Sequence, residues 1–336
     1  MLIIPQPKNT IANLIDKHHE SKTEQPRPHM GASQLGHPCE RYLWLNFRWV
    51  VQEKFKGRIL RLFRRGQNEE ATIISDLRAI GIDVRGTQTR VNFDAHVSGS
   101  ADGVALSGVP ESPSKSHVLE FKTHSLKSFN DVVKKGVEAS KYQHFVQMQV
   151  YMLGLDIDRA LYVAVCKDND EIYTERVKLD KELAQKYVAR GQRIALDDRM
   201  PPPLSTDPTW FECRFCPAHS FCHKQELPQK FSCRTCAHAT PKEDSTWRCE
   251  KHEADGIPVE FQRKGCDSGL IHPDIVQWKY TAEGDEVVWH TEFGDITNGV
   301  PDANIYAASE ILANPEACAK GLGAEIRDRF DGKVVG

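Results

Sequence analysis

The sequence contains no long run of apolar residues. A membrane-spanning helix needs roughly 20 of them in succession, and no stretch of this chain approaches that length. Near the N-terminus, Leu2, Ile3 and Ile4 are followed at once by Pro5, which leaves too short a run for the core of a signal peptide. We therefore expect a cytoplasmic protein that has no membrane partner.

Net positive charge is also lacking. The 336 residues include 44 Lys and Arg against 47 Asp and Glu, for a formal net charge of −3. Any surface that binds nucleic acid through its phosphates must therefore be local. No internal repeat is visible, and the length suits either one large domain with an appendage or two domains.

The hydrophobic pattern predicts an α/β fold. Helices and strands are expected to alternate, which predicts a mixed central β-sheet flanked by helices. A cap at Asn9 or Thr10 would begin the first helix. The predicted strands span 82–93, 96–100, 117–123, 160–167, 171–179 and 287–291, and the predicted helices span 10–19, 57–80, 125–135, 142–155, 180–196 and 303–312.

Two charges lie on an apolar strand that we expect to be buried. Glu120 and Lys122 are two positions apart, so their side chains point to the same face of the strand. Burying such charges is costly unless they have partners or a function. Upstream, Asp102 follows a second predicted strand. An Asp at a turn followed by Glu-x-Lys on a strand indicates a metal-dependent phosphodiesterase site.

Cleavage of a phosphodiester needs a hydroxide nucleophile and stabilisation of the phosphate charge. Mg²⁺ can supply both, held by one or two carboxylates and otherwise by water and phosphate oxygens. Asp102 and Glu120 are the candidate ligands for Mg²⁺ or Mn²⁺, with the Phe121 carbonyl as a third. Lys122 could orient the water or stabilise charge on the phosphate, and Glu70 could add a carboxylate from the preceding helix.

A plainer interpretation of the same strand remains open. Glu120 and Lys122 could form only an exposed ion pair, since Glu-x-Lys alone is weak evidence. A second example, at Glu20 and Lys22, has no comparable surroundings.

Four motifs occur in an order that resembles the PD-(D/E)XK nucleases of the RecB type. The likeness extends to the CRISPR-associated RecB-like exonucleases that carry an iron–sulfur cluster, and to their phage-encoded relatives. It covers about residues 31–223 and implies a restriction-endonuclease-like core. The motifs are Gly66–Glu70, Gly99–Gly103, Glu120–Lys122 and Gln147–Tyr151.

The resemblance also implies a role for each motif residue. The first motif offers a carboxylate, the second a metal-binding Asp, and the third a metal-binding Glu and a Lys. The fourth offers a Gln and a Tyr for DNA contact and active-site support. In this chain they are Glu70, Asp102, Glu120, Lys122, Gln147 and Tyr151.

Two positions depart from the pattern of the family. Ala101 stands where the second motif has Pro, and Gln67 stands where some members have His. Glu69 competes with Glu70 for the role of the first carboxylate, and we prefer Glu70.

Ten cysteines are unusual for a chain of this kind, and clustered cysteines in a reducing compartment more often bind metal than form disulfides. The resemblance implies that one early and three late thiolates hold a [4Fe–4S] cluster, which suits four thiolate ligands. A zinc site with the same ligands is the alternative. The ligands would be Cys39, Cys213, Cys216 and Cys222.

A second group of four cysteines resembles a zinc ribbon or knuckle, with His252 as a reserve ligand. This short stretch has little apolar content, so it would need the metal in order to fold. Its function could be DNA contact, protein contact or stability. The group is Cys233, Cys236, Cys249 and Cys266, whereas Cys166 and Cys318 are expected to be ordinary buried thiols.

Cations and aromatic residues alternate between residues 41 and 65, where Glu53 is the only acid. Such a pattern can follow a phosphate backbone and stack bases. An amphipathic helical region with a solvated charged face explains it slightly better, and both interpretations stay open.

These patterns divide the chain into four predicted regions and favour one function. We expect a Mg²⁺- or Mn²⁺-dependent DNA exonuclease acting in phage recombination, repair or DNA processing, in the cytoplasm of a bacterial host. Its partners would be DNA ends, single-stranded or duplex, and a recombination or single-strand-binding protein. The predicted regions are a flexible arm (1–29), a nuclease domain (30–223), a zinc-ribbon-like module (224–272) and a C-terminal extension of unknown role (273–336).

Two other functions remain open on the sequence. The chain could be an endonuclease of the same fold, or a non-catalytic module for DNA binding or assembly. The intact set of Asp102, Glu120 and Lys122 argues against a module without activity.

Overall fold

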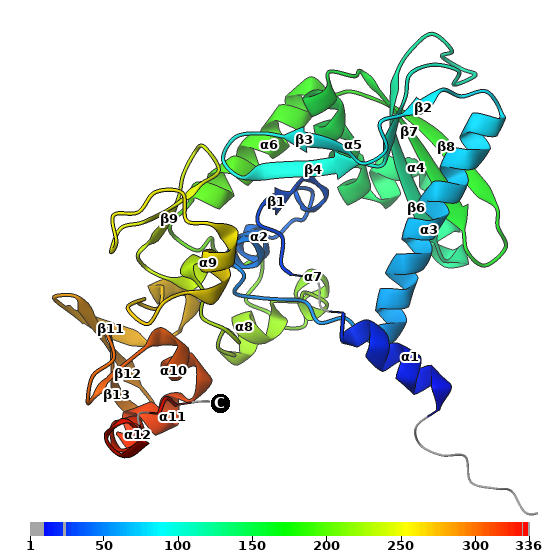
Figure 1. Ribbon diagram of the computed structural model, residues 1–336. Coiled ribbons are helices and arrows are strands. Elements are labelled where there is room, and N and C mark those ends of the chain that lie inside the picture. The colour runs from blue at the N-terminus through cyan, green and yellow to red at the C-terminus, as the bar shows by residue number, and fades with distance from the viewer. Residues whose placement is uncertain (1–9, 23–24, 331, 335–336) are drawn as a thin grey trace, which may run out of the picture.

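A computed structural model describes residues 10–22, 25–330 and 332–334 (Figure 1). The fold is α/β, as predicted, and is built around a mixed five-stranded sheet with the strand order β2-β5-β6-β7-β8. The central neighbours β6 and β7 are parallel, and the other adjacent pairs are antiparallel. The strands are β2 (Val84–Arg85), β5 (Gly103–Ala105), β6 (His117–His124), β7 (Arg159–Cys166) and β8 (Ile172–Lys178).

Helices cover both faces of this sheet. On one face Leu119 and Phe121 of β6 pack with apolar side chains of the long helix α3. On the other face Val118 belongs to the core that α4 and α5 share. Because side chains alternate along a strand, Glu120 and Lys122 lie on the α5 face. The covering helices are α3 (Gly57–Ala79), α4 (Leu126–Ser140) and α5 (Tyr142–Leu155), and α6 (Lys181–Leu196) packs in turn on α5.

A second sheet adjoins the first at Asp102. Its strand order is β1-β4-β3, and β4 is separated from β5 of the main sheet by that single residue. The chain therefore passes from one sheet to the other at Asp102, and this bend places a carboxylate beside β6. The strands are β1 (Met30–Gly31), β3 (Thr89–Asn92) and β4 (Val97–Ala101).

The predicted strand over 82–93 is wrong as a single element. Residues 84–85 pair with β5 in the main sheet, whereas residues 89–92 pair with β4 in the smaller sheet. The chain turns between them at Gly86, whose φ of +55° is unfavourable for residues with a side chain. Alternating apolar residues on both sides of that turn made two strands resemble one, and β5 was not predicted at all.

The other predicted elements of residues 10–196 are confirmed within a few residues. The predicted bounds of α5 match those of the structure, and α4 continues five residues beyond its predicted end, with a break at Gly136 (φ 76°). Helix α1 (Ile11–Glu20) begins after Thr10, although the Thr10 side chain makes no capping hydrogen bond. The alternative cap, Asn9, lies outside the described residues.

The chain beyond α6 forms short helices, then two small sheets and a terminal helical layer. The predicted strand over 287–291 is confirmed as β12, but the predicted helix over 303–312 is wrong in its first half, where residues 305–306 form a strand. The elements of this part are α7 (Phe211–Arg214), α8 (His219–Lys224), η2 (Cys233–Thr235), β9 (Ala239–Pro241), β10 (Trp247–Cys249), α9 (Val259–Lys264), η3 (Pro273–Ile275), β11 (Lys279–Glu283), β12 (Glu286–Thr291), β13 (Gly294–Asn298), β14 (Ile305–Tyr306), α10 (Ala308–Ala313), α11 (Pro315–Ala319) and α12 (Leu322–Phe330). Two short helices, η1 (Ala32–Gln34) and α2 (Glu40–Phe47), lie earlier in the chain, before α3.

A buried arginine joins the cysteine-rich segment to the N-terminal part of the chain. Arg234 is 1% exposed, and its guanidinium donates to the carbonyls of Phe47 and Pro28 at 2.9 and 2.8 Å. The same group lies over the rings of Trp49 and Trp247, 4.0 and 4.9 Å from their centroids, which are distances typical of cation–π contacts. One apolar core also runs from the main sheet into the last two sheets. The four predicted region boundaries stay predictions.

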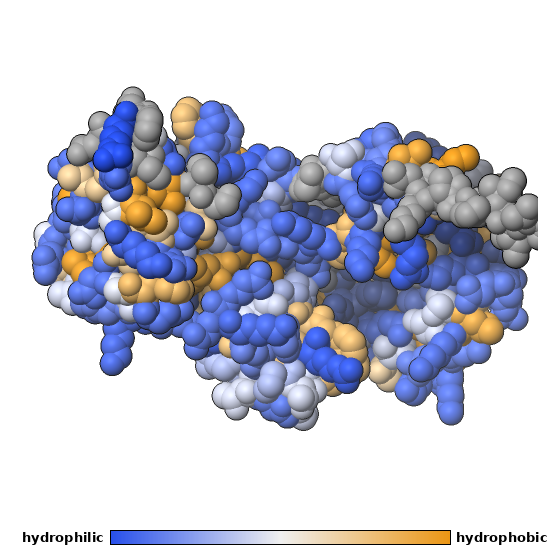
Figure 2. Space-filling view, turned by 90° about the horizontal axis from the view of Figure 1, so that it is seen from below, coloured by the Kyte–Doolittle hydropathy of each residue, from blue (hydrophilic) through white to orange (hydrophobic). Residues whose placement is uncertain are grey.

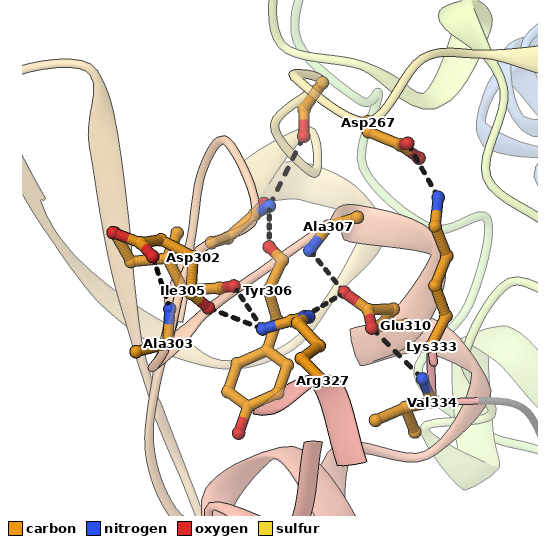
Figure 3. Close-up of polar contacts among 12 residues, drawn as sticks. Asp267, Asp302, Ala303, Ile305, Tyr306, Ala307, Glu310, Arg327, Lys333 and Val334 are labelled. Carbon is orange, nitrogen blue, oxygen red and sulfur yellow. Dashed lines mark hydrogen bonds and ion pairs between the residues drawn. The ribbon is translucent and has the colours of Figure 1, made fainter. Parts of the chain in front are cut away.

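A buried carboxylate organises the C-terminal helices (Figure 3). Glu310 is 2% exposed and accepts hydrogen bonds from Arg327 at 2.5 Å and from the backbone of Val334 at 3.1 Å. Arg327 also donates to the carbonyl of Ile305, and its guanidinium lies over the ring of Tyr306. These contacts tie the last described residues back to β14.

No helix in the described parts of the chain is long and apolar enough to cross a membrane. The face in Figure 2 is largely hydrophilic, with scattered apolar patches and a hollow to the right of its centre.

Candidate active site

Asp102 reaches β6 because the backbone ladder between β5 and β6 stops short. The last backbone pair before the bend is Gly103 with Leu119. Beyond it the N–H group of Phe121 has no partner on β5, and Asp102 Oδ2 accepts its hydrogen at 2.8 Å. A backbone donor that would otherwise be unpaired therefore orients this carboxylate.

Glu120 and Lys122 form an ion pair on the same face of β6. The carboxylate of Glu120 is 0% exposed, and its second oxygen accepts a hydrogen bond from Gln147 Nε2 at 2.9 Å. The Lys122 ammonium donates to the Phe121 carbonyl at 3.1 Å. The alternative of a merely exposed pair is wrong, because Glu120 is fully enclosed.

The two buried carboxylates share one nearby ammonium. Burial raises the pKa of Glu120 to about 7, and Lys122 acts in the opposite direction. Burial likewise raises the pKa of Asp102, again opposed by Lys122. Burial alone would lower the pKa of Lys122, but the charges of Glu120 and Asp102 outweigh it and raise that pKa. The site holds more negative charge than it neutralises, which favours a bound cation.

Glu70 lies within electrostatic reach of this centre. Burial raises its pKa, the negative charge of Asp102 adds to the rise, and Lys122 opposes it. Its Oε2 accepts a hydrogen bond from Gln88 Nε2 at 3.3 Å. These contacts favour Glu70 over its neighbour Glu69 as the carboxylate of the first motif.

Helix α5 supports Glu120 through two side chains one turn apart. Besides contacting Glu120, Gln147 Nε2 lies 3.5 Å from the hydroxyl of Tyr151. The Tyr151 ring packs so closely on β4 that a Cβ added at Gly99 would lie 2.8 Å from it. Gly99 is required here because the Tyr151 ring lies so close to its backbone. The second motif, which contains Gly99, and the fourth, which contains Tyr151, therefore depend on each other.

The donor set at this centre fits a hard divalent cation. In the residues that the structure describes, no group of three or more His, Cys, Asp or Glu side chains is arranged to hold a metal. Mg²⁺ needs no such group, because one or two carboxylates with water and phosphate oxygens suffice. Asp102 Oδ1 accepts no hydrogen bond from the described residues, so Asp102 and Glu120 can supply those carboxylates. The Phe121 carbonyl now accepts from Lys122, which leaves it a weaker candidate ligand.

Four cysteines predicted to act together line one small cavity of about 20 Å³, which is partly open to solvent. The early thiol lies at the start of α2, where its sulfur accepts from the backbone of Tyr42 at 3.4 Å. Burial raises the pKa of Cys216 to about 11, and the three other thiols add to this rise. The four are Cys39, Cys213, Cys216 and Cys222, which line this cavity together, although in the described residues they are not arranged as a group that holds a metal.

The second cysteine group also converges. Burial raises the pKa of Cys233 to about 11, with added effects from Cys266 and Cys249. Burial raises the pKa of Cys236 to about 12, and Cys233 and Cys266 again contribute. The predicted reserve ligand His252 instead contacts Ser268, its Nε2 lying 3.2 Å from the hydroxyl. No disulfide joins any of the ten cysteines.

The basic aromatic segment 41–65 separates into a core part and a surface part. Trp44, Phe47 and the cation of Arg48 are all buried, with the Arg48 guanidinium 4.7 Å from the centroid of the Trp44 ring. Those rings cannot stack bases, so that part of the prediction is wrong. Four of the remaining cations lie on α3, where a groove of about 390 Å³ is lined by Arg58, Arg61, Leu62, Arg64, Arg65 and Asn68.

Sequence reasoning missed a set of polar side chains beside Lys122. Tyr162, on β7, contacts His124 and His144 through its hydroxyl. His124 is two residues after Lys122 on the same face of β6, and His144 is one turn before Gln147 on α5. Those two spacings were the available signal.

Comparison with known proteins yields structural likenesses only. No protein-family model matches the chain, and no curated protein does. The fold is similar to that of a protein named SSO0001, at 15% identity and a TM-score of 0.39, over 62% of this chain and 93% of that one. It is also similar to LHK-Exo, an alkaline exonuclease of Laribacter hongkongensis. The complex of LHK-Exo with dAMP matches at 15% identity and a TM-score of 0.39, over 54% of this chain and 89% of that one.

A further likeness is to a phage-related exonuclease of Haemophilus somnus 129PT. The identity is 19% and the TM-score 0.30, over 40% of this chain and 70% of that one.

Proposed function

We propose that this chain is a Mg²⁺- or Mn²⁺-dependent deoxyribonuclease with a restriction-endonuclease-like core. The observation that carries the proposal is the convergence of Asp102, Glu120 and Lys122 where the chain bends between two sheets. Two enclosed carboxylates beside one ammonium suit the binding of a divalent cation and of a phosphodiester.

Each side chain has a distinct function in this proposal. Asp102 and Glu120 offer the metal-binding oxygens, and Gln147 holds the Glu120 carboxylate in place. Lys122 presents its ammonium beside them, where it orients water or stabilises charge on a phosphate oxygen. A bound Mg²⁺ would lower the pKa of a water nucleophile and polarise the phosphate. Glu70 adds negative charge that strengthens cation binding.

We further propose that the enzyme degrades DNA from its ends, in phage recombination, repair or DNA processing. The resemblance of the four motifs to RecB-type exonucleases supports this choice. An endonuclease of the same fold and a non-catalytic DNA-binding module are the alternatives. Closed circular DNA distinguishes the first alternative, because an exonuclease leaves it intact.

Two metal centres with a structural function complete the proposal. The gathering of four thiols around one small cavity supports a [4Fe–4S] cluster, with zinc as the competing occupant. Cys39 comes from the start of α2 and its partners from residues 213–222, so the centre would join two distant parts of the chain. The second thiol group, around Cys233, suits zinc.

The test is a cleavage assay on end-labelled linear and closed circular DNA with Mg²⁺ or Mn²⁺. We expect loss of at least about 100-fold in rate for Asp102→Asn and for Lys122→Ala, as is typical when a charge-stabilising group is removed. The matched controls are Asp131→Asn and Lys135→Ala, an exposed ion pair on α4 at 2.7 Å that should cleave normally. Cleavage that survives in both site variants refutes the assignment.

A further inference from the structure

A chain of hydrogen bonds lies beside Lys122 and involves no residue of the four motifs. The hydroxyl of Tyr162 is 2.8 Å from His124 Nε2 and 3.1 Å from His144 Nδ1. The other ring nitrogen of His124 lies 3.1 Å from Ser128 Oγ. The chain therefore connects side chains from β6, β7, α4 and α5, the elements around the candidate site.

These hydrogen bonds run along the face of the sheet that carries Glu120 and Lys122. Tyr162 is the register partner of Glu120 in the parallel ladder of β6 and β7, so both side chains leave the sheet on the same side. His124 is four residues after Glu120 and shares that side. His144 is three residues before Gln147, the residue of α5 that contacts Glu120, so the two lie on one helix face.

Hydrogen counting restricts the roles of the two histidines. A tyrosine hydroxyl has one hydrogen, so between two imidazole nitrogens it donates to one and accepts from the other. If His124 Nε2 donates to Tyr162, then Tyr162 donates to His144 Nδ1, and neutral His144 carries its hydrogen on Nε2. In the opposite polarity, His144 Nε2 is an acceptor. A phosphate oxygen next to Nε2 favours the first polarity, because such an oxygen only accepts.

The Nε2 atom of His144 is the free end of this series of hydrogen bonds. It has no hydrogen-bond partner within the residues that the structure describes, and it is not among the enclosed unpaired atoms. The residue is half-buried. Burial lowers the pKa of His144 to about 3, and the Lys122 ammonium adds to that effect. The imidazole is therefore neutral, and in the first polarity its one hydrogen lies on Nε2, near the Lys122 ammonium.

We propose that His144 donates a hydrogen bond from Nε2 to an oxygen of the scissile phosphate. Tyr162, His124 and Ser128 are then positioning residues that set the tautomer and the orientation of the His144 ring. The ligand is a phosphodiester oxygen on which negative charge grows during cleavage, and a donor held in place beforehand stabilises that charge most. The inference rests on the proposed nuclease function.

Single-turnover cleavage with protein in excess separates the cleavage step from DNA binding. We expect His144→Ala to slow cleavage by about 100-fold, the effect typical of removing one donor to a developing oxyanion. The Kd for DNA, measured in the Asp102→Asn background, should change little. Tyr162→Phe should slow cleavage less, and Tyr162→Phe combined with His144→Ala should be no slower than His144→Ala alone, because Tyr162 acts through His144.

Two further variants keep the test decisive. Tyr173→Phe removes a hydroxyl from β8 of the same sheet, where it contacts Glu175, and should cleave at the wild-type rate. His144→Gln retains a side-chain amide that can donate, so it should fold if His144→Ala does not, and it should recover part of the cleavage rate.

Three results would overturn the inference. The first is a wild-type rate in His144→Ala, or a rate in His144→Gln no higher than in His144→Ala. The second is a pair of effects for His144→Ala and Tyr162→Phe that multiply in the double variant. The third is a lowered melting temperature in both variants with an unchanged rate of the cleavage step. That result would mean that these hydrogen bonds have only a structural role. If the wild-type protein shows no metal-dependent cleavage, both the proposed function and this inference fail. If the wild-type protein cleaves DNA and His144→Ala cleaves it at the same rate, only this inference fails.

Discussion

At the scale of single residues, Glu120 and Lys122 are an ion pair whose members are not equivalent. Glu120 is enclosed and held by Gln147, while Lys122 is 27% exposed at its side chain and also donates to the Phe121 carbonyl. An ion pair alone could form with the acid at position 120 and the base at position 122, or with the two exchanged. Metal binding needs the carboxylate at the enclosed position.

Exchanging the two charges tests this inequivalence. The double variant Glu120→Lys with Lys122→Glu retains an opposite-charge pair, but it removes the carboxylate that Gln147 orients. We expect loss of at least about 100-fold in the DNA cleavage rate. The measurement is cleavage of end-labelled DNA, alongside a thermal melt that confirms folding. Retained activity in a folded double variant would contradict the whole site.

Gly99 shows the same dependence of the site on close packing. A Cβ at this position would lie 2.8 Å from the Tyr151 ring and 2.9 Å from the Cβ of Ala32. We expect Gly99→Ala to destabilise the fold by about 1–3 kcal/mol, as overpacking typically does. We also expect it to slow cleavage by up to about 100-fold, because Tyr151 supports Gln147 and misplaced groups react slowly.

Gly31→Ala is the matched control in the adjacent strand. The nearest atoms to an added Cβ there are 3.4 Å or more away, so the residue should be tolerated. Thermal melts and cleavage rates of both variants check the prediction, and equal behaviour of the two would contradict it.

At the scale of elements, α5 connects the separate parts of the site. Its Gln147 contacts β6, its Tyr151 packs on β4, and its His144 contacts β7. Because α5 is largely hydrophobic, it is buried among the sheets. Polar side chains on a buried helix must find hydrogen-bond partners within the protein. The proposed centre of early and late cysteines would make a second connection of this kind, between α2 and α7 with α8.

The cysteine connection predicts a loss of metal and of stability together. We expect Cys39→Ser to lose iron and to lower the melting temperature, because the centre would tie two segments far apart in sequence. Cys166→Ser, at a buried thiol of β7 outside both groups, should keep its full metal content. Iron, sulfide and zinc analysis of anaerobically purified protein measures the effect. Zinc without iron in the wild-type protein would contradict the cluster.

At the scale of the whole molecule, the C-terminal extension packs on the rest rather than standing apart. Asn298 is 0% exposed, accepts a hydrogen bond from the backbone of Ile271 at 2.9 Å and donates to the Gly269 carbonyl at 3.3 Å. Lys333 reaches Asp267 at 2.6 Å (Figure 3). The extension therefore packs on the segment that follows the second cysteine group.

Removal of residues 273–336 should destabilise more than the extension itself. Ile271, now 1% exposed, shares an apolar core with Trp289 and Ile296 of the extension and would lose that cover, and a buried aliphatic side chain contributes about 2–5 kcal/mol. We expect the melting temperature to fall by about 10 °C or more. Thermal unfolding followed by circular dichroism checks this.

The matched variant for this truncation is Glu310→Gln. It weakens the contact with Arg327 but leaves the cover in place, so a smaller fall is expected. An unchanged melting temperature after truncation would show that the extension is independent.

The sequence by itself determined the local elements and the chemical types in the site. Helical periodicity defined α5, and the Glu-x-Lys spacing placed both charges on one strand face, because these depend on neighbours along the chain. The tertiary structure decided the rest. It divided the strand predicted over 82–93 between two sheets, enclosed Arg48 and Arg234 among tryptophans, and brought Asp102 to the open end of a backbone ladder. It also joined His144 to Tyr162, because contacts between residues distant in sequence follow from the packing of elements, which local patterns do not encode.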